Sequence, residues 1–290
     1  MIKNRYAALA VIIFIYVLAV LCGLFTYDFF EGKFSAGEGQ SSFRLSLLLA
    51  DITATILVFI FSLIFRNASV YDPYWSVQPP VILALAISKM NANGTGVTLL
   101  GWLLFAAVLF WALRLTGNWI YNFKSFEYQD WRYLMLIEKT GPADPLINGL
   151  GIHMFPTLVV YLCVLPAVTA IVQGAAFKPL CLAFIVLCFT ATVFQGLADI
   201  QMHRFRNSGA GGFIQTGLWK KSRHPNYACE ILMWWGIGFA SVIATGGPYW
   251  LLAGAAVNTL MFLFVSIPMA DKHQARKAGF EEYKKNTRML

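Results

Sequence analysis

The chain has 290 residues, of which 58% are hydrophobic and only 12% are charged. Soluble domains carry about 25% charged residues, so this composition excludes an ordinary soluble protein and indicates an integral membrane protein. The formal net charge is +8. In so apolar a chain we attribute the excess to the orientation of loops at the membrane, and we expect no nucleic acid partner.

The apolar segments predict an all-α fold, a polytopic membrane helical bundle with seven to eight transmembrane helices. A helix needs about 20 residues to cross the hydrocarbon core of a bilayer. Eight runs come near that length, although the third is short. The runs are Tyr6–Phe25, Ser46–Phe65, Val77–Ser88, Val97–Gly117, Ile152–Gln173, Phe177–Ala198, Tyr227–Thr245 and Tyr249–Pro268.

Lysine and arginine are distributed unevenly between the two sides of this bundle. With eight spans and a cytoplasmic N-terminus, most of them fall in cytoplasmic segments, in agreement with the positive-inside rule. If the short third run does not cross, the first half inverts. The second half still places Asp199–Pro225 and the C-terminal tail in the cytoplasm.

Neither the cysteines nor the histidines form a recognisable metal or redox motif. The five cysteines lie in or beside apolar runs without a C-x-x-C pair, which is typical of small buried side chains. The chain also lacks the glycine-rich fingerprint of a Rossmann domain and the P-loop motif. We therefore expect no metal site, and no nucleotide cofactor bound by a Rossmann domain.

A polar stripe continues the sixth apolar run. Asp199, His203 and Arg206 are spaced i, i+4 and i+7, so they share one face of a helix, and Gln195 extends that face one turn into the membrane. One interpretation is a face that grips a polar ligand at the cytoplasmic edge. The other is a solvated helix end with an internal ion pair. The spacing alone favours neither.

Glu230 is a carboxylate inside an apolar run. Pro225 suits the first turn of a helix, which places Asn226 and Glu230 on one face. A carboxylate there needs a partner, because an unpaired buried charge is costly. Glu230 and Asn226 are candidates to hydrogen-bond a ribose or an amide of a cofactor, with Arg223 on phosphate. The alternative is an internal pair between Glu230 and an arginine.

Residues 71–76, Tyr-Asp-Pro-Tyr-Trp-Ser, form a second polar island, between the second and third runs. Aromatic rings in such a place are typical of anchors at the membrane interface. An Asp and a Tyr beside an apolar cavity can instead polarise a carbonyl and deliver a proton. Asp72, Tyr71 and Tyr74 are therefore the candidate catalytic residues.

Arg114 and Asn118 are spaced i, i+4 late in the fourth run. An arginine so near the membrane edge often extends its side chain to water. Arg114 is also a candidate to reach a phosphate, or a carboxylate such as Asp72.

The segment Phe280–Arg288 is a basic, amphipathic tail. The simpler interpretation is a patch beside the membrane that is attracted to anionic lipid, by about 1 kcal/mol per basic residue. The alternative is a lid that closes over a cytoplasmic ligand.

Taken together, these motifs resemble the steroid 5-alpha-reductase family, and more closely its bacterial branch of membrane proteins. The N-terminal signatures of the branch are similar to Val70–Ser76 and to Arg114-Leu115-x-x-Asn118. The similarity covers roughly residues 60–290. The matching C-terminal motifs are Asp199-x-Gln201-x-x-x-Phe205-Arg206, Gly217-Leu218-Trp219, Ser222-Arg223-His224-Pro225-Asn226-Tyr227 with Glu230, and Tyr283 and Arg288.

The resemblance implies an NADPH-dependent oxidoreductase that transfers hydride to a C=C bond conjugated with a carbonyl, in a steroid-like or other lipid substrate. It implies one membrane domain over residues 1–290, with a substrate-cavity half at 46–150 and a cofactor-binding half at 151–290. Tyr71-Asp72 falls where the steroid enzymes have a Gln-Glu pair that polarises the substrate carbonyl. The implied cofactor contacts are Arg114, Asn118, Gln195, Asp199, His203, Arg206, Arg223, Asn226, Tyr227, Glu230, Tyr283 and Arg288.

Two other functions compete with the reductase. Isoprenylcysteine carboxyl methyltransferases also carry an R-H-P-x-Y motif and a downstream Glu-Tyr tail, and they use S-adenosylmethionine. A lipid-binding or transport protein on the same scaffold would have a cavity but no cofactor. The expected partners are a hydrophobic small molecule from the bilayer and membrane lipids, without an obligate protein partner. The expected location is the inner membrane of a bacterium or the endoplasmic reticulum of a eukaryote, with a cytoplasmic C-terminus.

Overall fold

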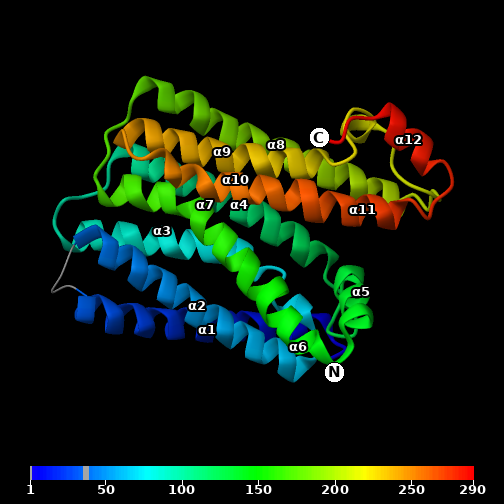
Figure 1. Cartoon of the computed structure of the whole chain (residues 1–290), viewed down its shortest axis with the longest axis horizontal. Helices are drawn as coiled ribbons and strands as arrows, with labels where there is room; N and C mark the ends of the chain where they lie inside the picture. The colour runs from blue at the N-terminus through cyan, green and yellow to red at the C-terminus, as the bar shows by residue number, and fades with distance from the viewer. Residues whose placement is uncertain (1, 35–38) are drawn as a thin grey trace. The chain divides into compact units, whose positions relative to one another are not determined.

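The computed structural model describes residues 2–34 and 39–290, and these form helices joined by short loops (Figure 1). Seven helical segments in these ranges are long and apolar enough to cross a membrane. This confirms the predicted all-α, polytopic bundle, at the lower end of the expected number of spans. The segments are Arg5–Lys33, Ser42–Phe65, Leu99–Asn122, Asp144–Val172, Pro179–Asn207, Pro225–Thr245 and Tyr249–Gln274.

The third predicted run forms a helix, but it is not one of these seven segments. Helix α3 (Tyr74–Ala92) extends beyond the predicted Val77–Ser88 at both ends. Its first turns carry Ser76, Gln78 and the Pro79-Pro80 pair. The apolar stretch that remains is therefore shorter than the thickness of the hydrocarbon core requires.

The chain divides into two compact units, and the boundaries fall inside two helices. The first unit comprises Met1–Asn93 and Leu115–Tyr161, and the second comprises Gly94–Arg114 and Leu162–Leu290. Helix α4 (Leu99–Asn122) and helix α7 (Phe155–Val172) therefore contribute residues to both units.

The first unit is built on α1 (Arg5–Phe34) packed against α2 (Gly39–Phe65), which lie side by side in Figure 1. Its buried core includes Ile15 of α1 and Val58 of α2. The outer face of α1 leaves apolar side chains such as Phe14 exposed, as contact with lipid requires. The remaining elements of this unit are α5 (Trp131–Thr140), η2 (Gly141–Ala143), α6 (Asp144–Ile147) and the π-helical η3 (Asn148–Met154).

A short turn between α2 and α3 fixes the segment that carries the candidate catalytic residues. Asn67 caps the 3₁₀ turn η1 (Ala68–Val70), because its side-chain oxygen accepts a hydrogen bond from a backbone amide of that turn at 2.9 Å. The Asn67 amide group also donates to the carbonyls of Phe126 and Tyr128, at 2.9 and 3.2 Å. One buried side chain thus attaches this segment to the loop after α4.

The second unit is built on α8 (Pro179–Asn207) packed against α9 (Pro225–Thr245), which run side by side in Figure 1. Helix α9 begins with Pro225 in its first turn, as the sequence predicts. It ends at Gly246, whose φ of 62° is left-handed and suits a helix C-cap. The other elements are η4 (Gly217–Lys220), η5 (Tyr249–Leu252), α10 (Ala253–Met261), the π-helical η6 (Phe262–Ser266), α11 (Ile267–Gln274) and α12 (Phe280–Asn286).

Helix α10 approaches α7 so closely that one contact leaves no room for a side chain. A Cβ on Gly254 would lie 2.2 Å from the backbone carbon of Leu162 and 2.3 Å from the backbone nitrogen of Cys163. Both neighbours are helix backbone, which cannot move aside as the end of a flexible side chain can. The packing of these two helices therefore depends on glycine at this position.

We expect Gly254→Ala to lower the free energy of unfolding by about 1–3 kcal/mol or more, because the added methyl group forces the two helices apart. The measurement is thermal unfolding of the detergent-solubilised protein, followed by circular dichroism. Gly117→Ala is the control, since a Cβ on Gly117 has nothing within 4 Å. It should be neutral or stabilising by up to about 1 kcal/mol. Equal effects of the two substitutions would contradict the close contact.

Candidate functional site

Glu230 lies at the centre of a buried polar cluster in the second unit. It is 2% exposed, one turn inside α9. Its Oε2 accepts hydrogen bonds from Nε1 of Trp111 at 2.8 Å and Nε2 of Gln195 at 2.5 Å, and its Oε1 accepts from Nε1 of Trp234 at 2.9 Å. These donors replace the water that a carboxylate loses on burial.

Arg114 connects Glu230 to Asp199. Its Nη1 donates to Oδ2 of Asp199 at 2.8 Å, and its Nη2 lies 3.8 Å from Oε2 of Glu230. The side chains of Arg114 and Asp199 are only 13% and 14% exposed, so the charges compensate one another away from water. The polar stripe of α8 therefore contains an ion pair, and its cation comes from α4. Glu230 also has an arginine beside it, as the alternative interpretation of that residue required.

Some polar atoms of this cluster are buried without a hydrogen-bond partner. They are Nε and Nη2 of Arg114 and Oε1 of Gln195. Buried polar atoms in native proteins are nearly always hydrogen-bonded, so unpaired ones mark a place where a ligand or water completes the set. The cluster thus offers N–H donors and a carbonyl acceptor to a ligand that both accepts and donates.

Positive side chains gather at the end of α8 that follows this cluster. His203 and Arg206 interact electrostatically with Asp199, as their shared helix face predicts. Planar guanidinium groups such as that of Arg206 bind phosphate oxygens in pairs. The exposed cations of this end are Arg204, Arg206, Lys220 and Lys221.

Arg223 binds the tail of the chain. Its Nη1 donates to the backbone carbonyls of Lys284 and Thr287, at 3.0 and 2.8 Å, and its backbone N–H donates to the carbonyl of Arg288 at 2.9 Å. Its Nη2 donates to Oδ2 of Asp271 at 3.1 Å. Only its Nε is unsatisfied among the guanidinium nitrogens. Most of the hydrogen-bonding capacity of Arg223 is therefore used inside the protein.

His224 shares the same carboxylate and begins the stack of rings at the start of α9. Its Nε2 lies 2.9 Å from Oδ1 of Asp271, and its ring is parallel to that of Tyr227, with centroids 5.3 Å apart. Burial lowers the pKa of His224 below its usual value, although the hydrogen bond to Asp271 acts in the opposite direction. Asn226 and Tyr227 are half-buried in the first turn of α9.

The Gly217-Leu218-Trp219 motif closes the end of α8. The Leu218 N–H donates to Oε1 of Gln201 at 2.9 Å, and Nε1 of Trp219 donates to a backbone carbonyl of α8 at 3.1 Å. Gly217 has a φ of 60°, in the left-handed region that favours glycine. The Tyr283 hydroxyl donates to the Trp219 carbonyl, which attaches α12 to this loop.

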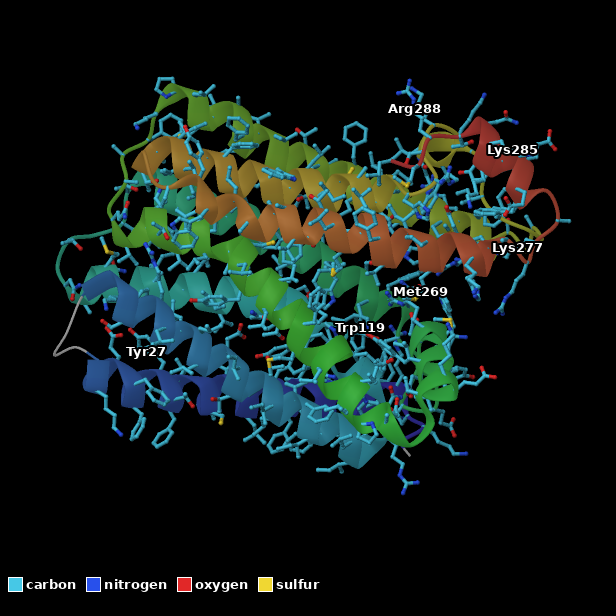
Figure 2. All side chains as sticks on the ribbon, in the orientation of Figure 1. Tyr27, Trp119, Met269, Lys277, Lys285 and Arg288 are labelled. Atoms are coloured by element: carbon cyan, nitrogen blue, oxygen red, sulfur yellow. The ribbon has the colours of Figure 1, made fainter. Side chains whose placement is uncertain are left out.

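The tail is amphipathic, as its sequence indicates. Phe280 is buried, and its ring contacts those of Phe213 and Tyr283, with centroids 5.2 and 5.9 Å apart. Figure 2 shows Lys285 and Arg288 around α12, and both are exposed. The tail therefore docks through aromatic rings and backbone carbonyls while these cations remain in contact with solvent.

In the first unit, Asp72 belongs to a small hydrogen-bonded group at the start of α3. Its Oδ1 accepts from the Tyr133 hydroxyl, and its Oδ2 accepts from Nε1 of Trp119 at 3.3 Å. Burial raises the pKa of Asp72 to about 6; the hydrogen bond from Tyr133 and the charge of Arg132 oppose this rise, and Asp130 adds to it.

The neighbours of Asp72 make separate contacts. The Tyr71 hydroxyl lies 2.8 Å from Oγ1 of Thr157, and burial raises the Tyr71 pKa. The Tyr74 hydroxyl points to Asp51, with 3.5 Å between the oxygens. Asn118, in the part of α4 that belongs to this unit, accepts a hydrogen bond on its carbonyl from Asn122 at 2.8 Å.

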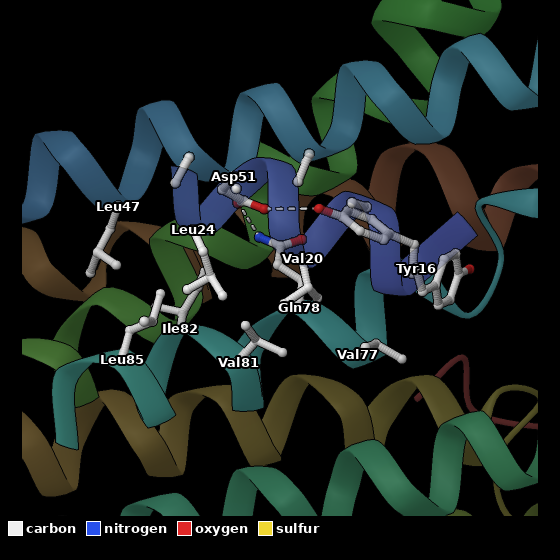
Figure 3. Close-up of a pocket in the computed structure, with 15 residues that line it drawn as sticks. Tyr16, Val20, Leu24, Leu47, Asp51, Val77, Gln78, Val81, Ile82 and Leu85 are labelled. Carbon is white, nitrogen blue, oxygen red and sulfur yellow. Dashed lines mark hydrogen bonds between the residues drawn. The ribbon is translucent and has the colours of Figure 1, made fainter. Parts of the chain in front are cut away.

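Tyr74 lines a pocket in the first unit. The walls are residues 16–24 of α1, 47–54 of α2 and 74–85 of α3. Most of these side chains are apolar, and the empty space is about 500 Å³ when the open solvent at the mouth is included. Figure 3 shows Asp51 and Gln78 on facing helices of this pocket, with dashed lines for the hydrogen bonds of Asp51.

Asp51 and Gln78 are not among the residues predicted from the sequence. Asp51 is a lone carboxylate in the middle of an apolar run, which is by itself a signal of function. Gln78 carries no comparable signal in the sequence, because the separation of Gln78 and Asp51 along the chain does not predict that the two side chains are in contact. Trp111, Trp234 and Asp271 were also missed, since each matters through a partner on another turn or helix.

Within residues 2–34 and 39–290, no three or more His, Cys, Asp or Glu side chains are grouped so as to hold a metal ion. The five cysteines are free; Cys163, Cys181 and Cys188 are buried and the other two are half-buried.

Length, composition and fold define a polytopic helical membrane protein. Residues 58–287 match the family model described as "Protein of unknown function (DUF1295)", and the chain belongs to this family. It is 27% identical to an uncharacterised protein of Schizosaccharomyces pombe over 249 residues, which cover 74% of this chain and 70% of that protein. No solved structure matches the chain. The family match includes the buried cluster of the second unit and excludes α1 and Asp51.

We expect Arg114→Met to lower the free energy of unfolding by about 3–5 kcal/mol, because it leaves two mostly buried carboxylates without their cation. Thermal unfolding in detergent is the measurement. Arg206→Met is the control, since Arg206 is an exposed cation on the polar face of α8, and it should change the stability by less than about 0.5 kcal/mol. If both variants lose the same stability, the ion pair does not hold the unit together.

We expect Asp72 to make the protein less stable as the pH rises from about 4 to about 6. The folded pKa of about 6 lies above the ordinary Asp value of about 3.9, so the folded state binds the proton more tightly than the unfolded state does. The stabilisation is complete below pH 4 and is lost as the pH passes the folded pKa. The melting temperature of wild type and of Asp72→Asn should be compared across this range. The same decrease in both proteins would rule out Asp72 as its source.

Proposed function

We propose that this protein is a membrane-embedded, NADPH-dependent reductase that transfers hydride to a C=C bond conjugated with a carbonyl in a hydrophobic, steroid-like or other lipid substrate. The observation that carries the proposal is the buried cluster around Arg114, Gln195 and Glu230, which retains unpaired donors and an unpaired acceptor. The similarity of the motifs to the steroid 5-alpha-reductase family supports the same function.

The residues of the second unit fit this cofactor. NADPH combines anionic phosphates with a carboxamide that both donates and accepts hydrogen bonds, and it supplies the hydride when bound. Oε1 of Gln195 is free to accept from an amide, and Nε and Nη2 of Arg114 are free to donate. Arg206 is exposed and suits phosphate. In this proposal Asp199, His203, Asn226 and Tyr227 complete the binding surface.

Arg223, Tyr283 and Arg288 act less directly in this proposal. Arg223 and the backbone of Arg288 bind each other, and Tyr283 binds the loop that closes α8. They position the tail beside the first turn of α9. Their contribution to cofactor binding is therefore the shape of the binding surface, with the exposed Arg288 side chain as an additional cation.

The first unit supplies the polarising group in this proposal. Asp72, with a pKa of about 6, can take up and release a proton near neutral pH. Tyr74 presents its hydroxyl inside the pocket, and Tyr71 is held by Thr157. A donor fixed against a carbonyl oxygen polarises it most strongly where water is excluded. The substrate reaches the pocket of α1, α2 and α3 from the bilayer.

The orientation in the membrane follows from the same proposal. Asp199–Pro225 and the tail face the cytoplasm, where NADPH is present. The basic residues of these segments agree with that side by the positive-inside rule. The membrane is the inner membrane in a bacterium or the endoplasmic reticulum in a eukaryote.

The competing candidate is an S-adenosylmethionine-dependent methyltransferase of the isoprenylcysteine carboxyl type. The observation that favours it is charge. Arg114 is the partner of two carboxylates, Asp199 and Glu230, so the buried cluster carries more negative than positive groups and suits the cationic sulfonium of S-adenosylmethionine. The exposed cations at the end of α8 favour the anionic NADPH instead.

We expect the purified, detergent-solubilised protein to bind NADPH saturably, and Arg206→Ala to weaken binding about tenfold or more, because it removes charge-assisted hydrogen bonds to phosphate. Glu230→Gln should weaken binding too, since it disturbs Gln195 and Arg114. The measurement is NADPH fluorescence, with NADH and S-adenosylmethionine as comparisons. Lys139→Ala is the control, because Lys139 is an exposed cation with no role in the proposal.

Tight binding of S-adenosylmethionine without NADPH binding would replace the reductase by the methyltransferase. Absence of binding for both cofactors would indicate a lipid-binding or transport protein.

A further inference from the structure

The pocket of the first unit contains one polar acceptor, the side-chain oxygen of Gln78, that no group within residues 2–34 and 39–290 satisfies. Gln78 is 4% exposed and lines the pocket. Its Oε1 is buried without a hydrogen-bond partner. A buried carbonyl oxygen without a hydrogen-bond partner costs about 1–3 kcal/mol of stability, so a ligand that donates a hydrogen bond to this atom would bind favourably.

The orientation of the Gln78 amide follows from its surroundings. Its Nε2 donates to Oδ2 of Asp51 and lies 3.5 Å from the carbonyl oxygen of Thr157. Two acceptors therefore face the nitrogen, which leaves the oxygen on the other side. Figure 3 shows the amide of Gln78 reaching across to Asp51.

The hydroxyl groups of the pocket wall are already committed elsewhere. The Tyr16 hydroxyl donates to the carbonyl of Val70 at 2.7 Å. The Tyr74 hydroxyl donates to Asp51, but at 3.5 Å this bond is long and weak. Both hydroxyl groups of the wall thus donate to acceptors other than Gln78, and the bond from Tyr74 is the weaker of the two.

We propose that this pocket binds an elongated apolar molecule that carries a hydroxyl group, and that Gln78 selects it by accepting a hydrogen bond from that hydroxyl. The hydroxyl oxygen in turn accepts from Tyr74. A ketone or an ether satisfies Tyr74 alone, and an ammonium group satisfies Gln78 alone. A hydroxyl group is the smallest group that satisfies both.

The shape of the pocket sets the rest of the molecule. The wall on α3 extends over residues 74–85, which is about 16 Å along a helix axis. The polar side chains lie toward one end of this length, and the far end is lined by Ile82 and Leu85. The ligand is therefore apolar beyond its hydroxyl group. As a statement about the substrate, the inference rests on the proposed reductase; as a statement about binding, it needs no cofactor.

The test compares matched pairs of ligands on the purified protein in detergent. The linear pair is 1-dodecanol and 1-methoxydodecane, and the fused-ring pair is cholesterol and its methyl ether. Affinity is measured from the rise in melting temperature with ligand concentration. Each ether has a methyl group in place of the hydroxyl hydrogen and so cannot donate, and the alcohol should bind about five- to tenfold more tightly in the pair whose skeleton fits. Equal affinity of alcohol and ether in both pairs would overturn the proposal without any variant.

The variants locate the effect. Gln78→Leu should abolish the preference for the alcohol and leave the affinity for the ether unchanged or higher. Val81→Phe fills the pocket and should abolish binding of both ligands, whereas Ala84→Val, at an exposed position of α3, should change neither. A preference that persists in Gln78→Leu or Val81→Phe would place the ligand elsewhere and overturn the proposal.

NADPH binding measured on the same proteins separates this inference from the proposed function. An alcohol preference that depends on Gln78, in a protein that does not bind NADPH, would support the pocket and refute the reductase. NADPH binding without the preference for the alcohol would support the reductase and refute the proposal for the pocket.

Discussion

The second unit depends on the guanidinium of Arg114, which lies beside the buried carboxylate of Glu230 and the largely buried carboxylate of Asp199. Arg114 comes from α4, Asp199 from α8 and Glu230 from α9. In an apolar surrounding each of these charges alone would cost several kcal/mol, so the three helices are compatible only as a set. The indole donors of Trp111 and Trp234 complete the shell of Glu230. The same set leaves atoms of Arg114 and Gln195 unpaired, and the residues that hold the helices together are therefore also those that offer a ligand its contacts.

The two units solve the problem of a buried carboxylate differently. Glu230 has a cation beside it, whereas Asp51 has the neutral donors of Tyr74 and Gln78 as its described contacts. A cation beside a carboxylate, as at Glu230, keeps that carboxylate ionised and in place. Neutral donors, as at Asp51, can exchange their hydrogen bonds with an incoming molecule. This contrast agrees with the separate roles that we propose, in which the second unit binds an ionic cofactor and the first binds an apolar molecule with one polar group.

The fold could be predicted from the sequence to a large extent, and the site only in part. Run length and composition were sufficient for the spans, because hydrocarbon thickness sets a minimum that seven segments meet. They left α3 open, because Gln78 and the Pro79-Pro80 pair interrupt its apolar pattern and the run was already short. Helical spacing identified the faces of α8 and α9, since residues four apart lie on one side. Spacing carries no information on which faces meet, and so neither the partner of Arg114 nor the contact between Asp51 and Gln78 could be derived.

The contacts of Arg223 also constrain the order of events during synthesis. Its acceptor at Thr287 lies 64 residues later in the chain, which corresponds to roughly 3–13 s of translation at about 5–20 residues per second. Two apolar segments, Pro225–Thr245 and Tyr249–Gln274, are made in that interval. Until Asp271 and then the tail are made, the guanidinium has water as its source of acceptors, so the start of α9 has to stay outside the hydrocarbon while the two segments insert. The contacts between Arg223 and the tail therefore form last. If Arg223 were drawn into the bilayer during insertion, the tail would lack its binding site.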